Sequence, residues 1–143
     1  MRIIFFGTPD FAMPVLEALQ KFSASVSYFR SKFLKDEAVF DEFKKLNPDL
    51  CVVAAYGKII PKRYLEVPKY GFVNVHPSLL PKYRGPSPVQ TAILNGEDET
   101  GVSIMMVDEE VDHGPVLAKQ EFSISNFQFS NHDELANELF ELG

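Results

Sequence analysis

The sequence predicts an α/β fold: a Rossmann-like, open and mostly parallel sheet with helices on both faces. Short apolar runs alternate with amphipathic segments along the chain, which is the pattern of strands and helices in such sheets. A length of 143 residues indicates a single domain, residues 1–143. Hydrophobic residues make up 45% of the chain and charged residues 24%, the usual mix for a globular domain.

The first half of the chain contains three predicted strands and two predicted helices. The strands are expected at residues 2–6, 25–29 and 50–55, and the helices at residues 11–22 and 36–46. The first and third strands are continuous apolar runs, which indicates burial on both faces. Thr8 or Asp10 could cap the first helix. Spacing puts five apolar side chains on one face of that helix, Phe11, Val15, Leu16, Leu19 and Phe22.

The second half is predicted to add a short helix, three strands and two longer helices. These are a helix at residues 61–65, a strand at 72–75, a helix at 87–94, strands at 101–107 and 116–124, and a helix at 131–142. Ser87 and Asn131 are the expected N-caps, and Glu134 stands where a capping box places its acidic residue. A short, turn-rich excursion joins the last two strands, so we expect them to be antiparallel.

Composition argues against several classes of protein. The net charge of −6 disfavours a module that binds nucleic acid by charge alone. The single cysteine, Cys51, cannot close an internal disulfide, and its apolar surroundings predict a packing role. No apolar run approaches the roughly 18 residues of a membrane span, and the N-terminus lacks a signal cleavage site. We therefore expect a cytoplasmic protein without membrane contact.

Polar residues at the expected carboxyl ends of the strands are the candidates for chemistry, because ligands of open α/β sheets bind there. Asn74 and His76 lie two residues apart on one strand, so their side chains project to the same side. An amide and an imidazole can both stabilise a developing oxyanion, and histidine exchanges protons near neutral pH. Asp112 lies in a later acidic turn, and a carboxylate close to a histidine favours its protonated form.

Other interpretations of these residues fit their spacing. Asn74 could cap a turn while His76 is a hydrogen-bonded histidine at a strand end. The turn after the first strand has one glycine where a dinucleotide fingerprint has three. The acidic turn could bind a metal, but its spacing fixes no ligand count, so we expect no metal. The side chains in question would be Asp108, Glu110, Asp112 and His113.

Three segments resemble the folate-dependent formyltransferases, and among them the enzymes that act on methionyl-tRNA. They are RIIFFGTPDFAMPVLEAL, NPDLCVVAAYGKIIPKRYL and NVHPSLLPKYRGPSPVQTAILNGEDETGVSIMMVDEEVDHGPVL. Together they cover most of residues 1–121. The formyltransferases of glycinamide ribonucleotide share an NxHPSLLP stretch, and those of sugar amines share similar cores. The GTPDF, AAYG and RGPSPVQ stretches favour the methionyl-tRNA type.

The resemblance implies the formyltransferase fold, 10-formyltetrahydrofolate as formyl donor and the amino group of initiator methionyl-tRNA as acceptor. The family's catalytic Asn, His and Asp fall on Asn74, His76 and Asp112. Phe11 would face the methionyl side chain. The residues implied near the folate are Tyr56, Gly57, Lys58, Ile59, Ile60 and Val111 at the pterin, with Ser78, Leu79, Leu80 and Pro81 beside it.

Two departures from the family reduce the expectation of efficient tRNA recognition. The family has a longer, basic segment between its second strand and the next helix, whereas here residues 28 and 29 lead almost directly into residues 30–36. We also expect the family's C-terminal tRNA-binding β domain to be absent. Two alternatives stay open: a formyltransferase for an amino-sugar nucleotide or another small amine, and a non-catalytic folate-binding fragment.

Overall fold

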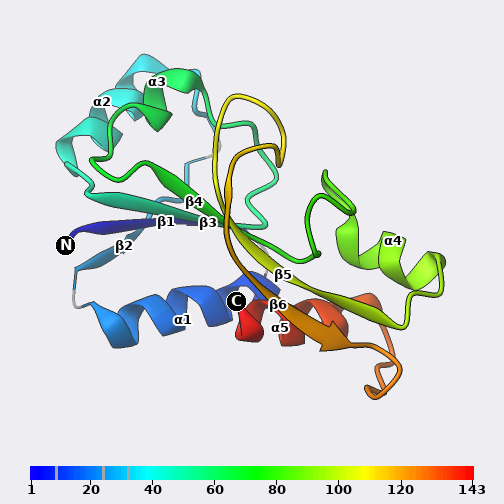
Figure 1. Cartoon of the computed structure of the whole chain (residues 1–143). Helices are drawn as coiled ribbons and strands as arrows, with labels where there is room; N and C mark the ends of the chain where they lie inside the picture. Colours follow the sequence, from blue (N-terminus) through cyan, green and yellow to red (C-terminus); the bar gives the residue numbers. More distant parts are fainter. Residues whose placement is uncertain (9, 24, 32) are drawn as a thin grey trace.

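Six strands form one sheet in this computed structural model, within the residues that it describes, 1–8, 10–23, 25–31 and 33–143. Helices alternate with the first four strands, and the last helix closes the chain (Figure 1). The elements in order are β1 (Ile3–Gly7), the 3-10 turn η1 (Asp10–Ala12), α1 (Met13–Phe22), β2 (Val26–Tyr28), α2 (Glu37–Lys45), β3 (Leu50–Ala54), α3 (Lys62–Leu65), β4 (Phe72–His76), α4 (Pro88–Leu94), β5 (Glu99–Met106), β6 (Val116–Ser123) and α5 (His132–Leu142).

The order of the strands in the sheet is β2-β1-β3-β4-β5-β6. Strands β1 to β4 pair in parallel, and β5 and β6 pair antiparallel with their neighbours. The predicted open, mostly parallel sheet and the antiparallel pairing of the last two strands are thus confirmed. The chain moves from β1 to one side for β2 and then to the other side for β3. This reversal lies at the carboxyl ends of β1 and β3, where open α/β sheets bind ligands.

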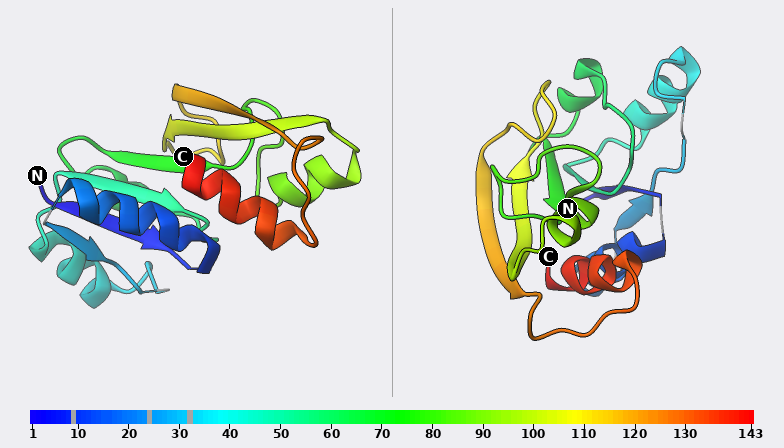
Figure 2. Two further views of the ribbon diagram at one scale, coloured as in Figure 1. Left: turned by 90° about the horizontal axis from the view of Figure 1, so that it is seen from below. Right: turned by 90° about the vertical axis from the view of Figure 1, so that its right-hand side faces the viewer.

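Helices cover both faces of the sheet, as predicted. Helices α2 and α3 lie on one face and α1 and α5 on the other (Figures 1 and 2). Successive side chains of β1 point to opposite faces of the sheet. Ile4 and Phe6 pack with α2 and α3, while Ile3 and Phe5 pack with α1 and α5. Helix α4 packs against α5 in a third, smaller apolar cluster. Helix α5 also contacts β5, so it connects α4 to the sheet.

Cys51 lies at the centre of the sheet, in β3 between β1 and β4. It is fully buried, and burial raises the pKa of its thiol. The predicted packing role of Cys51 fits this position. Among the helices in the described parts of the chain, none has the length and apolarity needed to cross a bilayer.

The start of the first helix differs from the prediction. A 3-10 turn precedes α1, and its N-cap residue, Ala12, makes no side-chain capping bond. Pro14 occupies the first turn of the helix and has no N–H to satisfy, which reduces the need for a cap. Thr8 instead donates its hydroxyl to the carbonyl of Tyr56 at 3.1 Å. Pro9, part of the predicted turn, lies outside the described residues.

Other helix ends follow their sequence signals more closely. Asp36 caps α2, and Asn131 caps α5 by accepting from the Glu134 N–H at 3.1 Å. Ser87 occupies the N-cap position of α4 without a side-chain bond. Phe22, predicted on the apolar face of the first helix, is 92% exposed because it is the last residue of α1, where the chain turns away at Ser23.

A change in the aromatic layer beneath α2 and α3 should destabilise the domain. Phe6 is fully buried, and its ring centroid lies within 5.0–5.8 Å of four other aromatic rings, those of Phe29, Phe43, Tyr56 and Phe72. We expect Phe6→Ala to lower the free energy of unfolding by about 3–5 kcal/mol, because it opens a cavity. Urea unfolding measures this. The matched control Phe22→Ala should change it by less than about 0.5 kcal/mol, and equal effects in both variants would contradict this account of the core.

Candidate active site

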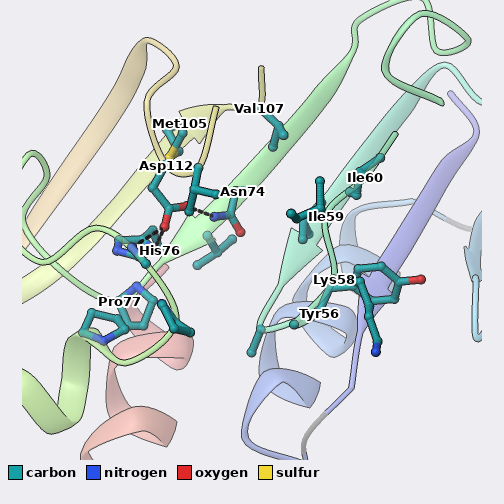
Figure 3. Close-up of a pocket in the computed structure, with 18 of the residues that line it drawn as sticks. Tyr56, Lys58, Ile59, Ile60, Asn74, His76, Pro77, Met105, Val107 and Asp112 are labelled. Atoms are coloured by element: carbon teal, nitrogen blue, oxygen red, sulfur yellow. Dashed lines mark hydrogen bonds and ion pairs between the residues drawn. The ribbon is translucent and has the colours of Figure 1, made fainter. Parts of the chain in front are cut away.

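The candidate catalytic residues come together at the carboxyl end of β4. Asn74 and His76 project from β4 on the same side as Phe72, toward the α2 and α3 face. Asp112 comes from the loop that joins β5 to β6 and points at both side chains (Figure 3). Three polar groups from two distant segments thus face a common point, and the two on β4 share a side as their spacing predicted.

The Asp112 carboxylate accepts hydrogen bonds from two of the surrounding groups. Oδ1 accepts from Asn74 Nδ2 at 3.2 Å, and Oδ2 accepts from the Gly85 backbone N–H at 2.8 Å. The same Oδ2 lies 3.6 Å from His76 Nδ1. The side chain of Asp112 is only 13% exposed, so these polar contacts replace most of its contact with water.

The imidazole of His76 is held from both sides. Its Nε2 lies 2.9 Å from the carbonyl oxygen of Tyr83, and its Nδ1 faces Asp112. A carbonyl oxygen can only accept, so Nε2 carries a proton and donates it to this bond. His76 is 4% exposed, which leaves it little freedom to turn.

The backbone of the acidic loop aims Asp112 at the site. Asp112 adopts a φ of 48°, in the left-handed region that Asp enters more readily than most residues. Gly114 packs so tightly on the strand that a Cβ there would lie 2.0 Å from the Met106 carbonyl oxygen. His113 and Asp108 form an ion pair at 2.9 Å, and Glu109 bonds to Lys62 of α3 at 2.6 Å. These contacts fix the loop at both ends.

A cavity of about 480 Å³ opens beside the three residues. One part of it is lined by predicted folate contacts, namely Val111 of the acidic loop and the segment after β3 (Tyr56, Gly57, Lys58, Ile59 and Ile60). Ile59 and Val111 are 78% and 59% exposed, which leaves an unusual aliphatic surface open at the mouth. Tyr56 is buried, and desolvation raises its pKa to about 12, so its hydroxyl stays protonated and donates to the Ser31 carbonyl.

The other part of the cavity was not predicted, apart from Phe11. Helix α5, the first turn of α4 and the segment before α4 line it together with Phe11, through Gly85, Pro86, Pro88, Val89, Gln90, His132, Ala136 and Phe140. The Phe11 and Phe140 rings stack with their centroids 5.7 Å apart. Local sequence gives no signal for this wall, because it depends on how the last helix packs on the sheet.

The predicted folate contacts Ser78, Leu79, Leu80 and Pro81 have a different position. The residues described as lining the cavity include Pro77 and Gly85 but none of these four. Ser78 and Leu80 are buried, and both bond to Ser103 of β5: Ser103 donates to the Ser78 carbonyl at 2.7 Å and accepts from the Leu80 N–H at 3.0 Å. This segment therefore braces the loop behind His76.

A metal site was the other interpretation of the acidic turn. In the described part of the chain, no group of three His, Cys, Asp or Glu side chains is placed to hold an ion. Asp108 and His113 pair with each other, while Asp112 turns toward Asn74. The acidic turn is thus divided between a structural pair and the candidate site.

Comparisons with known proteins point to one family. The Formyl transferase family matches residues 8–141. Methionyl-tRNA formyltransferase of Thermus thermophilus is 43% identical over 148 positions, covering 82% of this chain and 48% of that protein. The enzyme of the same name from Thermodesulfovibrio yellowstonii is 38% identical over 172 positions, covering 99% of this chain and 55% of that protein. The chain thus spans about half the length of these relatives.

Solved structures share the fold. Methionyl-tRNA formyltransferase from Clostridium thermocellum superposes with a TM-score of 0.75 at 26% identity, covering 98% of this chain and 61% of that one. Phosphoribosylglycinamide formyltransferase from Bacillus halodurans gives 0.75 at 22% identity, covering 97% and 87%. The 172 positions of the Thermodesulfovibrio alignment exceed the 143 residues of this chain, so at least 29 of them have no counterpart here.

The ion pair in the acidic loop should make the domain's stability depend on pH. The hydrogen bond from His113 to Asp108, with Glu110 nearby, raises the pKa of His113 above 6.5. The same bond lowers the pKa of Asp108 below 3.8. The contribution of protonated His113 is complete below pH 6.5 and is lost as pH rises through the raised pKa. The Asp108 contribution is present above pH 3.8 and is lost as pH falls through the lowered pKa.

We therefore expect the urea midpoint of the native protein to decline above pH 6.5 relative to that of His113→Gln, which has no charge to lose. Urea titrations of both proteins from pH 5 to about pH 9 measure the difference. The double variant Asp108→Asn/His113→Gln is the control and should behave as the single variant does. Parallel curves for the native protein and His113→Gln would show that the pair contributes nothing.

Proposed function

Because this chain belongs to the formyl transferase family, we propose that its residues 1–143 form a catalytic domain that transfers a formyl group from 10-formyltetrahydrofolate to the amino group of methionyl-tRNA. The observation that carries the proposal is the gathering of Asn74, His76 and Asp112 at the edge of one cavity. The 38–43% identity to relatives named for methionyl-tRNA supports the acceptor.

Asn74 and His76 supply the electrostatic part of the reaction. When an amine attacks a formyl carbon, negative charge develops on the formyl oxygen. Asn74 Nδ2 and a protonated His76 Nδ1 are donors on the same side of β4 that can bind this oxygen, while the Tyr83 carbonyl keeps the ring from turning. Fixed donors of this kind stabilise developing charge without reorganising during the reaction.

Asp112 has two roles in the proposed reaction: it transfers a proton, and it orients the side chains beside it. As the formyl carbon bonds to the amine and its bond to the donor nitrogen breaks, the amine must lose a proton and the leaving nitrogen must gain one. A carboxylate beside the reaction centre can carry this proton from one nitrogen to the other, directly or through a water molecule. The same carboxylate also faces His76 Nδ1 at 3.6 Å and helps to orient the ring. Its bonds to Asn74 and Gly85 hold the carboxylate in reach of both roles.

The donor side of the cavity fits a flat, partly apolar ring. Ile59 and Val111 expose aliphatic surface that a pterin ring would cover, and Val107 also lines the cavity. 10-Formyltetrahydrofolate supplies the activated formyl group when bound, so the protein's part is position and electrostatics. We keep Tyr56, Gly57, Lys58, Ile59, Ile60 and Val111 as the residues that would hold it.

The acceptor side of the cavity suits an unbranched apolar side chain such as that of methionine. Phe11, Val89 and Phe140 form its apolar walls. Burying a methionine side chain there would contribute roughly 1.5–3 kcal/mol. Phe11 therefore keeps the role that the sequence suggested, with Phe140 as its partner.

A small amine is a second candidate acceptor, favoured by one specific observation. At least 29 positions of the Thermodesulfovibrio relative have no counterpart in this chain, and the connection from β2 to α2 spans only residues 29–36. Both facts fit the loss of a segment that would extend the rim of the site. Such a change would weaken contact with a large acceptor more than contact with a small one.

Removing either oxyanion donor should slow formyl transfer. We expect Asn74→Ala and His76→Ala each to lower kcat by a factor on the order of 10²–10³, because a developing charge loses a fixed donor. Formyl transfer to methionyl-tRNA measures the effect. The exposed residue Asn126 provides a matched control, and Asn126→Ala should retain full activity. Full activity of His76→Ala would remove His76 from the chemistry.

The acceptor can be identified by competition. We expect kcat/KM for methionyl-tRNA to exceed that for each member of a panel of amino-sugar nucleotides and amino acids other than methionine, with 10-formyltetrahydrofolate as donor. These compounds lack the methionyl side chain that would pack against Phe11. A higher value for a small amine would establish the second candidate instead. Binding of a folate analogue without turnover of any amine would indicate a non-catalytic folate-binding domain.

A further inference from the structure

One short backbone segment contacts both the imidazole and the carboxylate of the site. The Tyr83 carbonyl accepts from His76 Nε2 at 2.9 Å, and the Gly85 N–H donates to Asp112 Oδ2 at 2.8 Å. Since these two contacts come from residues two positions apart, a shift of this segment moves the partners of His76 and Asp112 together.

The backbone of this segment has an uncommon conformation. Tyr83 has a φ of 57° and Gly85 a φ of 96°, both in the region that favours glycine. A tyrosine stays there only where its surroundings hold it. The described residues that line the cavity do not include Tyr83. The contacts that hold its backbone therefore lie outside the cavity.

Side chains at the end of α4 supply these contacts and so form an anchor for the segment. The Tyr83 hydroxyl donates to Glu97 Oε1 and accepts from Asn95 Nδ2 at 2.9 Å. Lys82 Nζ donates to the same Glu97 oxygen at 2.7 Å. The hydrogen bonds from Lys82 and Tyr83 hold the pKa of Glu97 below its ordinary value, so it is a carboxylate at neutral pH. Asn95 is the C-cap residue of α4, which connects the anchor to a packed helix.

We propose that Tyr83 and Glu97 are positioning residues for the formyl transfer proposed above. Their hydrogen bond holds the Tyr83 backbone in the left-handed region. The Tyr83 carbonyl then fixes the Nε2 side of His76, and Gly85 fixes Asp112. The inference rests on the proposed function for its effect on rate, but its effect on the His76 hydrogen bond can be measured without any substrate.

The test compares two matched tyrosine variants of the whole chain. Tyr83→Phe removes only the anchoring hydroxyl, whereas Tyr70→Phe removes that of a tyrosine 54% exposed elsewhere on the surface. We expect exchange of the His76 Nε2–H with water, followed by NMR on ¹⁵N-histidine-labelled protein, to become about tenfold faster in Tyr83→Phe and to stay unchanged in Tyr70→Phe. In the formyl-transfer assay, kcat should fall about 10- to 100-fold in Tyr83→Phe, with KM for the donor within about twofold.

Two changes at Glu97 distinguish anchoring from general destabilisation. Glu97→Gln keeps an acceptor oxygen for the Tyr83 hydroxyl, so we expect slow exchange and most of kcat to be retained. Glu97→Ala should show the same faster exchange and lower kcat as Tyr83→Phe. If Tyr83→Phe does not fold, the comparison of Glu97→Gln with Glu97→Ala still tests the proposal. Unchanged exchange at His76 in Glu97→Ala would overturn the proposal. Absence of formyl transfer in the native protein would overturn the proposed function alone, because the exchange measurement still reports on the anchor.

Discussion

The site depends on the contacts that the Asp112 carboxylate makes with its polar neighbours. This carboxylate is largely buried and lies against an amide, an imidazole and a backbone N–H that come from two separate stretches of the chain. A charge in such a place is tolerated only when polar partners surround it. These three partners bring the acidic loop against β4 at the point where Asn74 and His76 face the cavity.

The two sides of the site differ in how firmly the fold holds them. Strand β4 is paired on both sides, with Asn74 opposite Val53 and Met105 and with His76 opposite Ser103, so the two donors stand on a backbone that cannot shift by itself. Asp112 stands on a loop held by side-chain ion pairs and one tight glycine. In the proposed reaction, the two groups on the strand would bind the developing charge, and the carboxylate on the loop would face them.

Much of the fold and part of the site could be predicted because they follow from local periodicity. Apolar runs locate the buried strands, and alternation along β4 places Asn74 and His76 on one side. The approach of Asp112 is not fixed by any spacing, and it was suggested by resemblance to a family. The wall formed by Ala136 and Phe140, and the Tyr83 carbonyl behind His76, depend on packing between distant segments. The resemblance implies a folate contact for residues 78–81, whereas in the structure Ser78 and Leu80 bond to Ser103 of β5, a contact that the local sequence does not indicate.

The place of Cys51 gives the domain an internal reporter of sheet opening. A thiol must be ionised and reached by solvent before it can be alkylated, and in β3 it is neither. Because the sequence contains one cysteine, every alkylation event records a moment when the centre of the sheet has separated. The rate of labelling under native conditions therefore measures the free energy of that opening, with no probe added to the molecule.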